Sequence, residues 1–130
     1  MTQVYLIRHA EAEGNLYRMA QGQYNSILTD RGRRQVQALE ARFRDIPVDA
    51  VYSSDLVRTP LPAGAICIPK NLPLRLDPGL REIHMGDWED KTWGEVRHFA
   101  GARLALFNHS DPSVRAPGDG EDLGALGNRV

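Results

Sequence analysis

The sequence is poor in the features that mark secreted and membrane proteins. It has a single cysteine, Cys67, which excludes an internal disulfide and indicates a reducing, cytoplasmic location. It has no apolar run long enough to cross a bilayer and no apolar leader after the N-terminus. We therefore expect a cytoplasmic protein with no membrane partner.

An excess of either charge is also lacking. The 16 Lys and Arg residues nearly balance the 17 Asp and Glu residues, for a formal net charge of −1. Although 14 of the basic residues are Arg and 2 are Lys, they are interleaved with acids, so no nucleic-acid partner is expected. The four histidines, at positions 9, 84, 98 and 109, have no metal-ligand spacing, and no cofactor is expected. Any anion site must be local.

Strand and helix patterns alternate along the chain. The apolar run over residues 4–7 is typical of a strand covered on both faces, and residues 48–52 are a second such run. Between them, Thr29-Asp30 can cap a helix with apolar residues at helical spacing. This order predicts an α/β, three-layer sandwich with a mainly parallel central sheet, as one domain over residues 1–130. The apolar positions of that helix are Val36, Leu39 and Phe43.

Two more helices are expected in the second half. Pro60 and Pro62 are compatible with a helix only in its first turn. Residues 92–95, "TWGE", have the form of a capping box, and apolar side chains then follow one helical face as far as Phe107. Residues 16–28 are expected to form a loop. The tail from residue 110 is rich in Gly, Pro and Asp and is expected to be loosely structured.

Residues suited to phosphate chemistry follow both expected strands. In open α/β sheets the ligand crevice lies beyond the carboxyl ends of the strands. Arg8-His9 follows the first strand, and Arg58 follows the second. Arginine presents a planar fork of donors to phosphate oxygens, and histidine can act as a nucleophile or a base. An Arg-His pair alone is more often an ordinary surface feature, so its surroundings decide.

Those surroundings resemble the histidine phosphatase superfamily, also called the phosphoglycerate mutase-like family. "RHAEAEGN" is similar to its opening pattern Arg-His-Gly-Glu followed by Asn, with Ala10 at the usual Gly position. "QGQYNSILTDRG", "VYSSDLVRT", "LREIHMGDWEDKTW" and "PGDGED" resemble its later patterns in the right order. Five ordered matches are specific where one would be weak. The matched site positions are Arg8, His9, Glu11, Asn15, Gln21, Gly22, Arg58 and Glu82.

The resemblance implies a phosphatase that hydrolyses a small phosphomonoester through a phosphohistidine on His9. Arg8 and Arg58 would hold the phosphoryl oxygens. Glu82 would act first as general acid and then as general base. The substrate would also meet four further residues, Asn15, Gln21, Gly22 and His84.

Several of these residues also fit plainer roles. Asn15 suits a turn after Gly14, and Glu82 suits a solvated charge paired with Arg81. His84 could line the mouth of the site or simply be exposed. For Trp88 and Trp93, packing is favoured over substrate stacking.

One family feature is missing. Members usually carry a second catalytic histidine in a Ser-His-Gly motif after a further strand, and this sequence contains no Ser-His-Gly. The chain therefore resembles a shortened member, with exposed apolar surface expected beside its first strand. "EIHMGDWEDKTW" resembles the phosphatase branch more than the glycolytic mutases. A mutase-type phosphoryl transfer and a non-catalytic phosphate-binding remnant stay open as alternatives, and the sequence carries no signal of oligomeric state.

Overall fold

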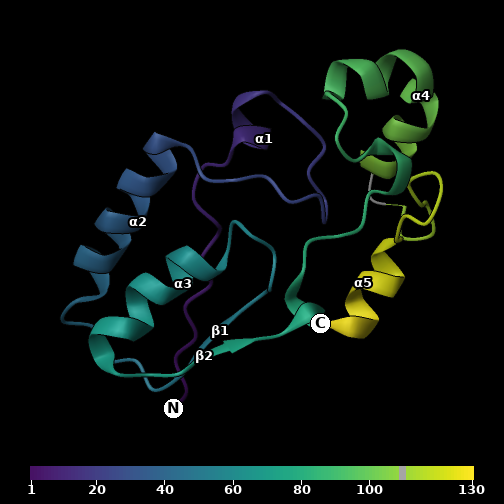
Figure 1. The fold of residues 1–130 in the computed structure, drawn as a ribbon. Coiled ribbons are helices and arrows are strands. Elements are labelled where there is room, and N and C mark those ends of the chain that lie inside the picture. The colour runs from purple at the N-terminus through teal and green to yellow at the C-terminus, as the bar shows by residue number, and fades with distance from the viewer. Residues whose placement is uncertain (109–110) are drawn as a thin grey trace.

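The computed structural model describes residues 1–108 and 111–130, so His109 lies outside the described residues. Helices and short strands alternate in the first two thirds of the chain, and two helices follow (Figure 1). Three short 3-10 turns lie at Ile68–Lys70, Pro78–Leu80 and Gly86–Trp88. The helices and strands are α1 (Glu13–Leu16), α2 (Asp30–Phe43), β1 (Val51–Ser53), α3 (Pro60–Cys67), β2 (Leu74–Leu76), α4 (Trp93–Asn108) and α5 (Leu123–Arg129).

The sheet is parallel, which confirms the predicted α/β class. Among the described residues it has two strands, β1 and β2, paired so that Val51 lies opposite Leu74 and Ser53 opposite Leu76. Helix α3 connects them and packs against both. The second predicted strand is thus present at residues 51–53, whereas β2 was not predicted because its Leu-Arg-Leu alternation is only three residues long.

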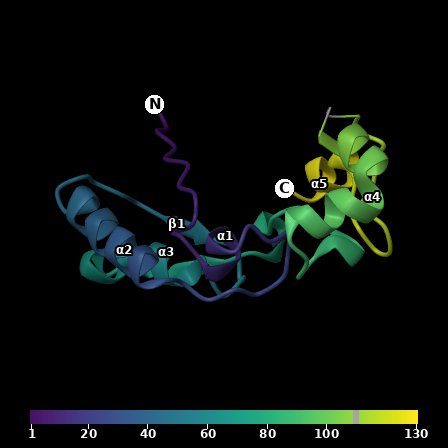
Figure 2. The same ribbon diagram turned by 90° about the horizontal axis from the view of Figure 1, so that it is seen from above.

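The predicted strand at residues 4–7 is wrong: these residues belong to no strand. Val4 is 73% exposed and Leu6 is 94% exposed, and the N-terminal segment rises away from the layer that contains β1 (Figure 2). A strand forms only where a neighbouring backbone satisfies its N–H and C=O groups, and no described strand pairs with this run. The expected exposure of apolar surface is present here. Tyr5 makes one aromatic contact, edge to face with Phe43 at 5.4 Å between ring centres.

The predicted helix starts are confirmed because their signals are local. Helix α2 begins after Thr29, whose hydroxyl accepts a hydrogen bond from Gly32 N at 3.0 Å. Helix α3 begins at Pro60, where the missing N–H costs no helical hydrogen bond. Before α4, Thr92 N donates to the Glu95 carboxylate at 2.8 Å and Glu95 N donates to the Thr92 hydroxyl at 3.2 Å.

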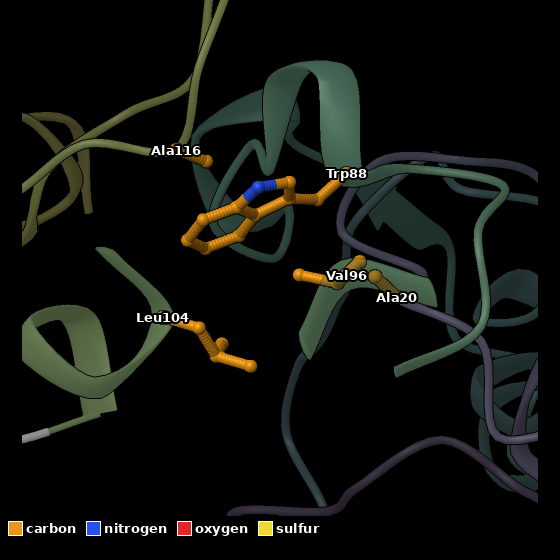
Figure 3. Packing of buried hydrophobic residues seen from close by; sticks show 5 residues of the cluster. All are labelled: Ala20, Trp88, Val96, Leu104 and Ala116. Atoms are coloured by element: carbon orange, nitrogen blue, oxygen red, sulfur yellow. The ribbon is translucent and has the colours of Figure 1, made fainter. Parts of the chain in front are cut away.

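Buried apolar side chains form two separate groups. In the first, α2, α3 and β1 pack together around Phe43 and Ile66, next to a small cluster at Val36. The second surrounds Trp88, which is fully buried and meets Phe107 edge to face at 5.4 Å, as packing rather than substrate stacking requires. Figure 3 shows Trp88 enclosed by four smaller side chains, Ala20, Val96, Leu104 and Ala116.

Two segments join these groups and carry part of the candidate site, including Gly22 and Glu82. The segment 12–28 leaves the first group at Ala12, reaches the second at Ala20 and returns at Leu28, which bridges back to Ala12. The segment 77–92 runs from the end of β2 to Trp88. The loop expected over residues 16–28 is irregular from residue 17, whereas Leu16 is the last residue of α1. The site residues therefore lie where the two groups meet.

The C-terminal tail is more ordered than its composition predicts. Helix α5 occupies Leu123–Arg129 and is capped by the Asp122 carboxylate, which accepts from Ala125 N at 2.7 Å. The prediction of a loosely structured tail is wrong here, because a local cap and long-range bonds from Arg129 hold this end. Among the described helices, none has the length and apolar character needed to cross a membrane.

Candidate active site

His9 lies half-buried at the edge of the first group, directly before Ala10. Its Nδ1 lies 2.7 Å from the backbone oxygen of Ala10. A carbonyl oxygen can only accept, so Nδ1 carries the proton and Nε2 keeps its lone pair. Burial lowers the pKa of His9, and the charges of Arg58 and Arg8 lower it further, against the Ala10 hydrogen bond and Glu82, which raise it. At neutral pH the imidazole is therefore neutral and its free nitrogen is nucleophilic.

Arg58 is the buried cation of the site, at 2% exposure. It donates from Nη1 to Tyr24 O at 2.9 Å and from Nη2 to Gly22 O at 2.7 Å, while its buried Nε has no partner. Burial lowers the pKa of Arg58 below its ordinary value, and the charges of Glu82 and Glu89 raise it. Neither acid forms a salt bridge with it among the described residues. The guanidinium thus keeps unused N–H donors and a positive charge for a further acceptor.

The other two expected catalytic residues, Arg8 and Glu82, shift the pKa of His9 in opposite directions. Arg8 is exposed, and its charge together with that of Glu82 bears on His9. The Glu82 carboxylate accepts from Ile83 N at 2.9 Å. The plainer role for Glu82, a pair with Arg81, is wrong, because Arg81 instead binds both carboxylate oxygens of Asp55, at 2.6 and 2.5 Å. Glu82 remains exposed, and its charge acts on His9 and Arg58.

Asn15 and Gln21 hold the segment 12–28 in shape. Asn15 Oδ1 accepts from Ala12 N at 2.9 Å, so its oxygen stabilises the turn of α1 as the plainer role predicts. Gln21 Oε1 accepts from the Ser26 hydroxyl at 2.7 Å, and its side chain packs on Gly14, where a Cβ would come within 2.4 Å of Gln21 Cγ. Both residues therefore have structural roles.

Gly22 and Glu89 form the contact that the sequence did not predict. Gly22 is buried with φ of +43°, and a Cβ there would lie 2.2 Å from Glu89 Oε1. That carboxylate oxygen accepts from Gln23 N at 2.7 Å and from Met85 N at 2.9 Å. Glu89 thus joins the loop that meets Arg58 to the loop that follows Glu82. The sequence does not distinguish Glu89 from the acids near it, because both of its partners are backbone N–H groups. One belongs to Met85, four residues earlier, and the other to Gln23 in another segment.

His84 is half-buried and contacts the "PGDGED" loop. Its backbone exchanges two hydrogen bonds with Glu121: His84 N donates to Oε2, and Glu121 N donates to His84 O, both at 2.8 Å. Its ring lies 3.9 Å from Glu89 and 3.6 Å from Asp119, and Nδ1 accepts from Gly86 N at 3.2 Å. The "PGDGED" loop therefore supports the segment that carries Glu82 and His84.

These groups can bind an anion and attack it with an imidazole nitrogen. No group of three His, Cys, Asp or Glu side chains in residues 1–108 and 111–130 is arranged to hold a metal. The charges of Arg8, Arg58 and Glu82 all act on His9, and the backbone oxygen of Gly22 binds Arg58.

Comparison with known proteins places this arrangement in a family. The family model for "Histidine phosphatase superfamily (branch 1)" matches residues 4–130. A probable phosphoglycerate mutase GpmB of Proteus mirabilis is 36% identical over 130 residues, which is all of this chain and 60% of that protein. The chain therefore spans about 60% of the length of such curated relatives.

Solved structures are similar as well. Bacillus stearothermophilus YhfR matches with a TM-score of 0.84 and 34% identity, over 94% of this chain and 60% of YhfR. A mycobacterial glucosyl-3-phosphoglycerate phosphatase in complex with VO3 matches with a TM-score of 0.82 and 31% identity, over 93% of this chain and 59% of that one. This chain belongs to branch 1 of the histidine phosphatase superfamily.

Proposed function

We propose that the site hydrolyses a small phosphomonoester through a phosphohistidine on His9. The observation that carries the proposal is the pairing of a half-buried, neutral histidine with Arg58, a buried cation whose Nε is unpaired. A phosphoryl group is the anion that both groups suit, since it offers oxygens to the guanidinium and phosphorus to the imidazole.

In the first step His9 Nε2 forms a bond to phosphorus and the bond from phosphorus to the ester oxygen breaks. The Glu82 carboxyl gives its proton to the departing oxygen. Arg58 and Arg8 offset the charge on the three phosphoryl oxygens. The Ala10 carbonyl, at 2.7 Å from Nδ1, stabilises the positive charge that the ring gains and keeps it in place.

In the second step water attacks phosphorus and the bond to Nε2 breaks. The Glu82 carboxylate takes a proton from the water, which returns both residues to their first states and releases inorganic phosphate. The 130-residue chain, tested on its own, does not contain the Ser-His-Gly motif that supplies one donor of the family's site, and loss of one such donor typically lowers the rate by on the order of 10²–10³. We expect slow turnover.

A slow reaction is best tested by labelling. The chain is incubated with a radiolabelled phosphomonoester, quenched in alkali, which preserves phosphohistidine, and digested to locate the label. We expect label on His9, none in His9→Gln, and a fall of about 10²-fold in labelling rate in Arg58→Ala. Arg34→Ala, which removes an exposed arginine on α2, is the matched control and should label like the wild type. Absence of label in the wild-type chain would leave only phosphate binding.

A second candidate is transfer of the phosphoryl group between hydroxyls, as the name of the Proteus mirabilis relative suggests. The same phosphohistidine would then be attacked by an alcohol instead of water. The fate of the label separates the two. Release as inorganic phosphate in the presence of excess phosphoglycerate supports hydrolysis, and recovery in a phosphoglycerate isomer supports transfer.

A further inference from the structure

Arg129, on the last turn of α5, contacts the loop that carries Glu82. Its Nη1 donates to Gly79 O at 2.6 Å and to Arg81 O at 2.8 Å, and its Nη2 donates to Glu82 O at 2.9 Å. Three carbonyls within four residues thus converge on one guanidinium. Arg129 lies 47 positions from Glu82 in the sequence, so the contact is tertiary.

Glu121 fixes Arg129 in this position. It accepts from Arg129 Nε at 2.6 Å and from Nη2 at 2.8 Å, which is a bidentate pair with two parallel bonds. The bonds to Arg129 hold the pKa of Glu121 below its usual range, so the carboxylate is ionised at neutral pH. Its Oε2 also accepts from His84 N at 2.8 Å. The pair therefore holds the loop backbone on both sides of Glu82.

Besides Arg129 and Glu121, side chains from other segments also bind this loop: Asp55 binds Arg81, and Gln23 Nε2 donates to Glu82 O at 3.3 Å. Residues 77–85 contain one 3-10 turn, Pro78–Leu80, and no strand or α-helix. The Glu82 side chain is exposed and bonds only to the adjacent Ile83 N among the described residues. Its distance from His9 is therefore set by the backbone of residues 79–84, which Arg129 and Glu121 hold. Gly79 is packed closely against this end of α5, where a Cβ would come within 2.7 Å of Arg129 O.

From these contacts we propose that Arg129 is a positioning residue for Glu82: by binding the carbonyls of residues 79, 81 and 82, it holds the carboxyl where it can protonate a leaving oxygen. This rests on the proposed function. Arg129 binds the backbone of the loop and makes no hydrogen bond to the Glu82 carboxylate or to His9 among the described residues.

The test compares two phosphoryl donors that differ in their need for an acid. A p-nitrophenolate leaves without a proton, whereas the alkoxide of an alkyl phosphate such as glycerol phosphate must be protonated as it leaves. In Arg129→Ala we expect the labelling rate of His9 from the alkyl phosphate to fall about tenfold or more relative to that from p-nitrophenyl phosphate. A purely structural loss would slow both reactions equally.

A matched control and a milder variant complete the design. Arg115→Ala removes a comparable ion pair, Arg115 with Asp122 at 2.7 Å, that has no bond to residues 79–84, and the donor ratio should not change. Glu121→Gln keeps the shape of the carboxylate but loses its charge, and should change the ratio in the same direction by less. If Arg129→Ala does not fold, the donor ratio of Glu121→Gln tests the positioning role instead.

Each outcome is decisive. Equal slowing with both donors in the folded variants, or an unchanged ratio, overturns the positioning role and leaves the phosphohistidine mechanism standing. A wild-type chain that acquires no label from either donor overturns the proposed function and the role of Arg129 in it.

Discussion

Replacing Gly22 with alanine tests how tightly the two site loops are joined. Gly22 has φ of +43°, a region that costs other residues about 1 kcal/mol. Its new methyl would lie 2.2 Å from Glu89 Oε1 and 3.0 Å from Ile83 O. Since the first distance is not tolerable and the second is tight, we expect the Glu89 carboxylate to move out of place.

The size of the effect follows from the bonds that Glu89 makes. Its Oε1 accepts from Gln23 N and Met85 N, and a hydrogen bond to a charged group contributes about 1.5–3 kcal/mol. Loss of one of these bonds together with the backbone strain gives about 2.5–4 kcal/mol of lost stability. That is a large part of the about 5–15 kcal/mol typical of a domain.

The assay is urea unfolding followed by circular dichroism, with Gly101→Ala as the matched control. A Cβ at Gly101 meets nothing within 4 Å, and the residue follows the kink of α4 at Ala100 without a positive φ, so alanine there should stabilise by about 0.4–1 kcal/mol by lowering the entropy of the unfolded chain. The same chemical change is thus expected to have opposite signs at the two positions. If Gly22→Ala is as stable as the wild type while Gly101→Ala behaves as expected, Glu89 does not hold the two loops together.

Three further predictions follow from burial, charge and capping. Because the pKa of His9 lies below 6.5 in the folded chain, the unfolded chain binds more protons just below that pH. The free energy of unfolding should therefore fall as pH drops from 6.5 toward the lowered pKa, and this part of the fall should be absent in His9→Gln. Identical pH dependence in both chains would contradict the lowered pKa. Trp88→Ala should lower the free energy of unfolding by about 3–5 kcal/mol in urea titrations, because Trp88 is fully buried, and a loss below about 1 kcal/mol would be inconsistent with that packing. Thr29→Ala should cost about 0.5–2 kcal/mol through the lost cap of α2, measured the same way, and no loss would mean that the cap at Gly32 N is replaced by water.

Much of the site was predictable because its residues are recognised by type and order. His9, Arg8, Arg58 and Glu82 were expected together, and the structure places their charges within reach of His9. The residues that hold the site loops in place, Glu89 and Arg129, were not predictable. Glu89 binds Gln23 N and Arg129 binds Glu82 O, both far away in the sequence, and backbone groups leave no mark in the sequence of their partners.

The sequence by itself determined the features that depend on neighbours within one helical turn. The cap at Thr29, the prolines at the start of α3 and the reciprocal pair of Thr92 and Glu95 all formed as predicted, because each needs only groups three or four residues away. Whether an apolar run becomes a strand was decided by tertiary structure. Residues 51–53 have β2 beside them and form a strand, whereas residues 4–7 have the same apolar character but no paired backbone and remain exposed. A strand's hydrogen bonds all lie outside itself, so its own residues cannot determine it.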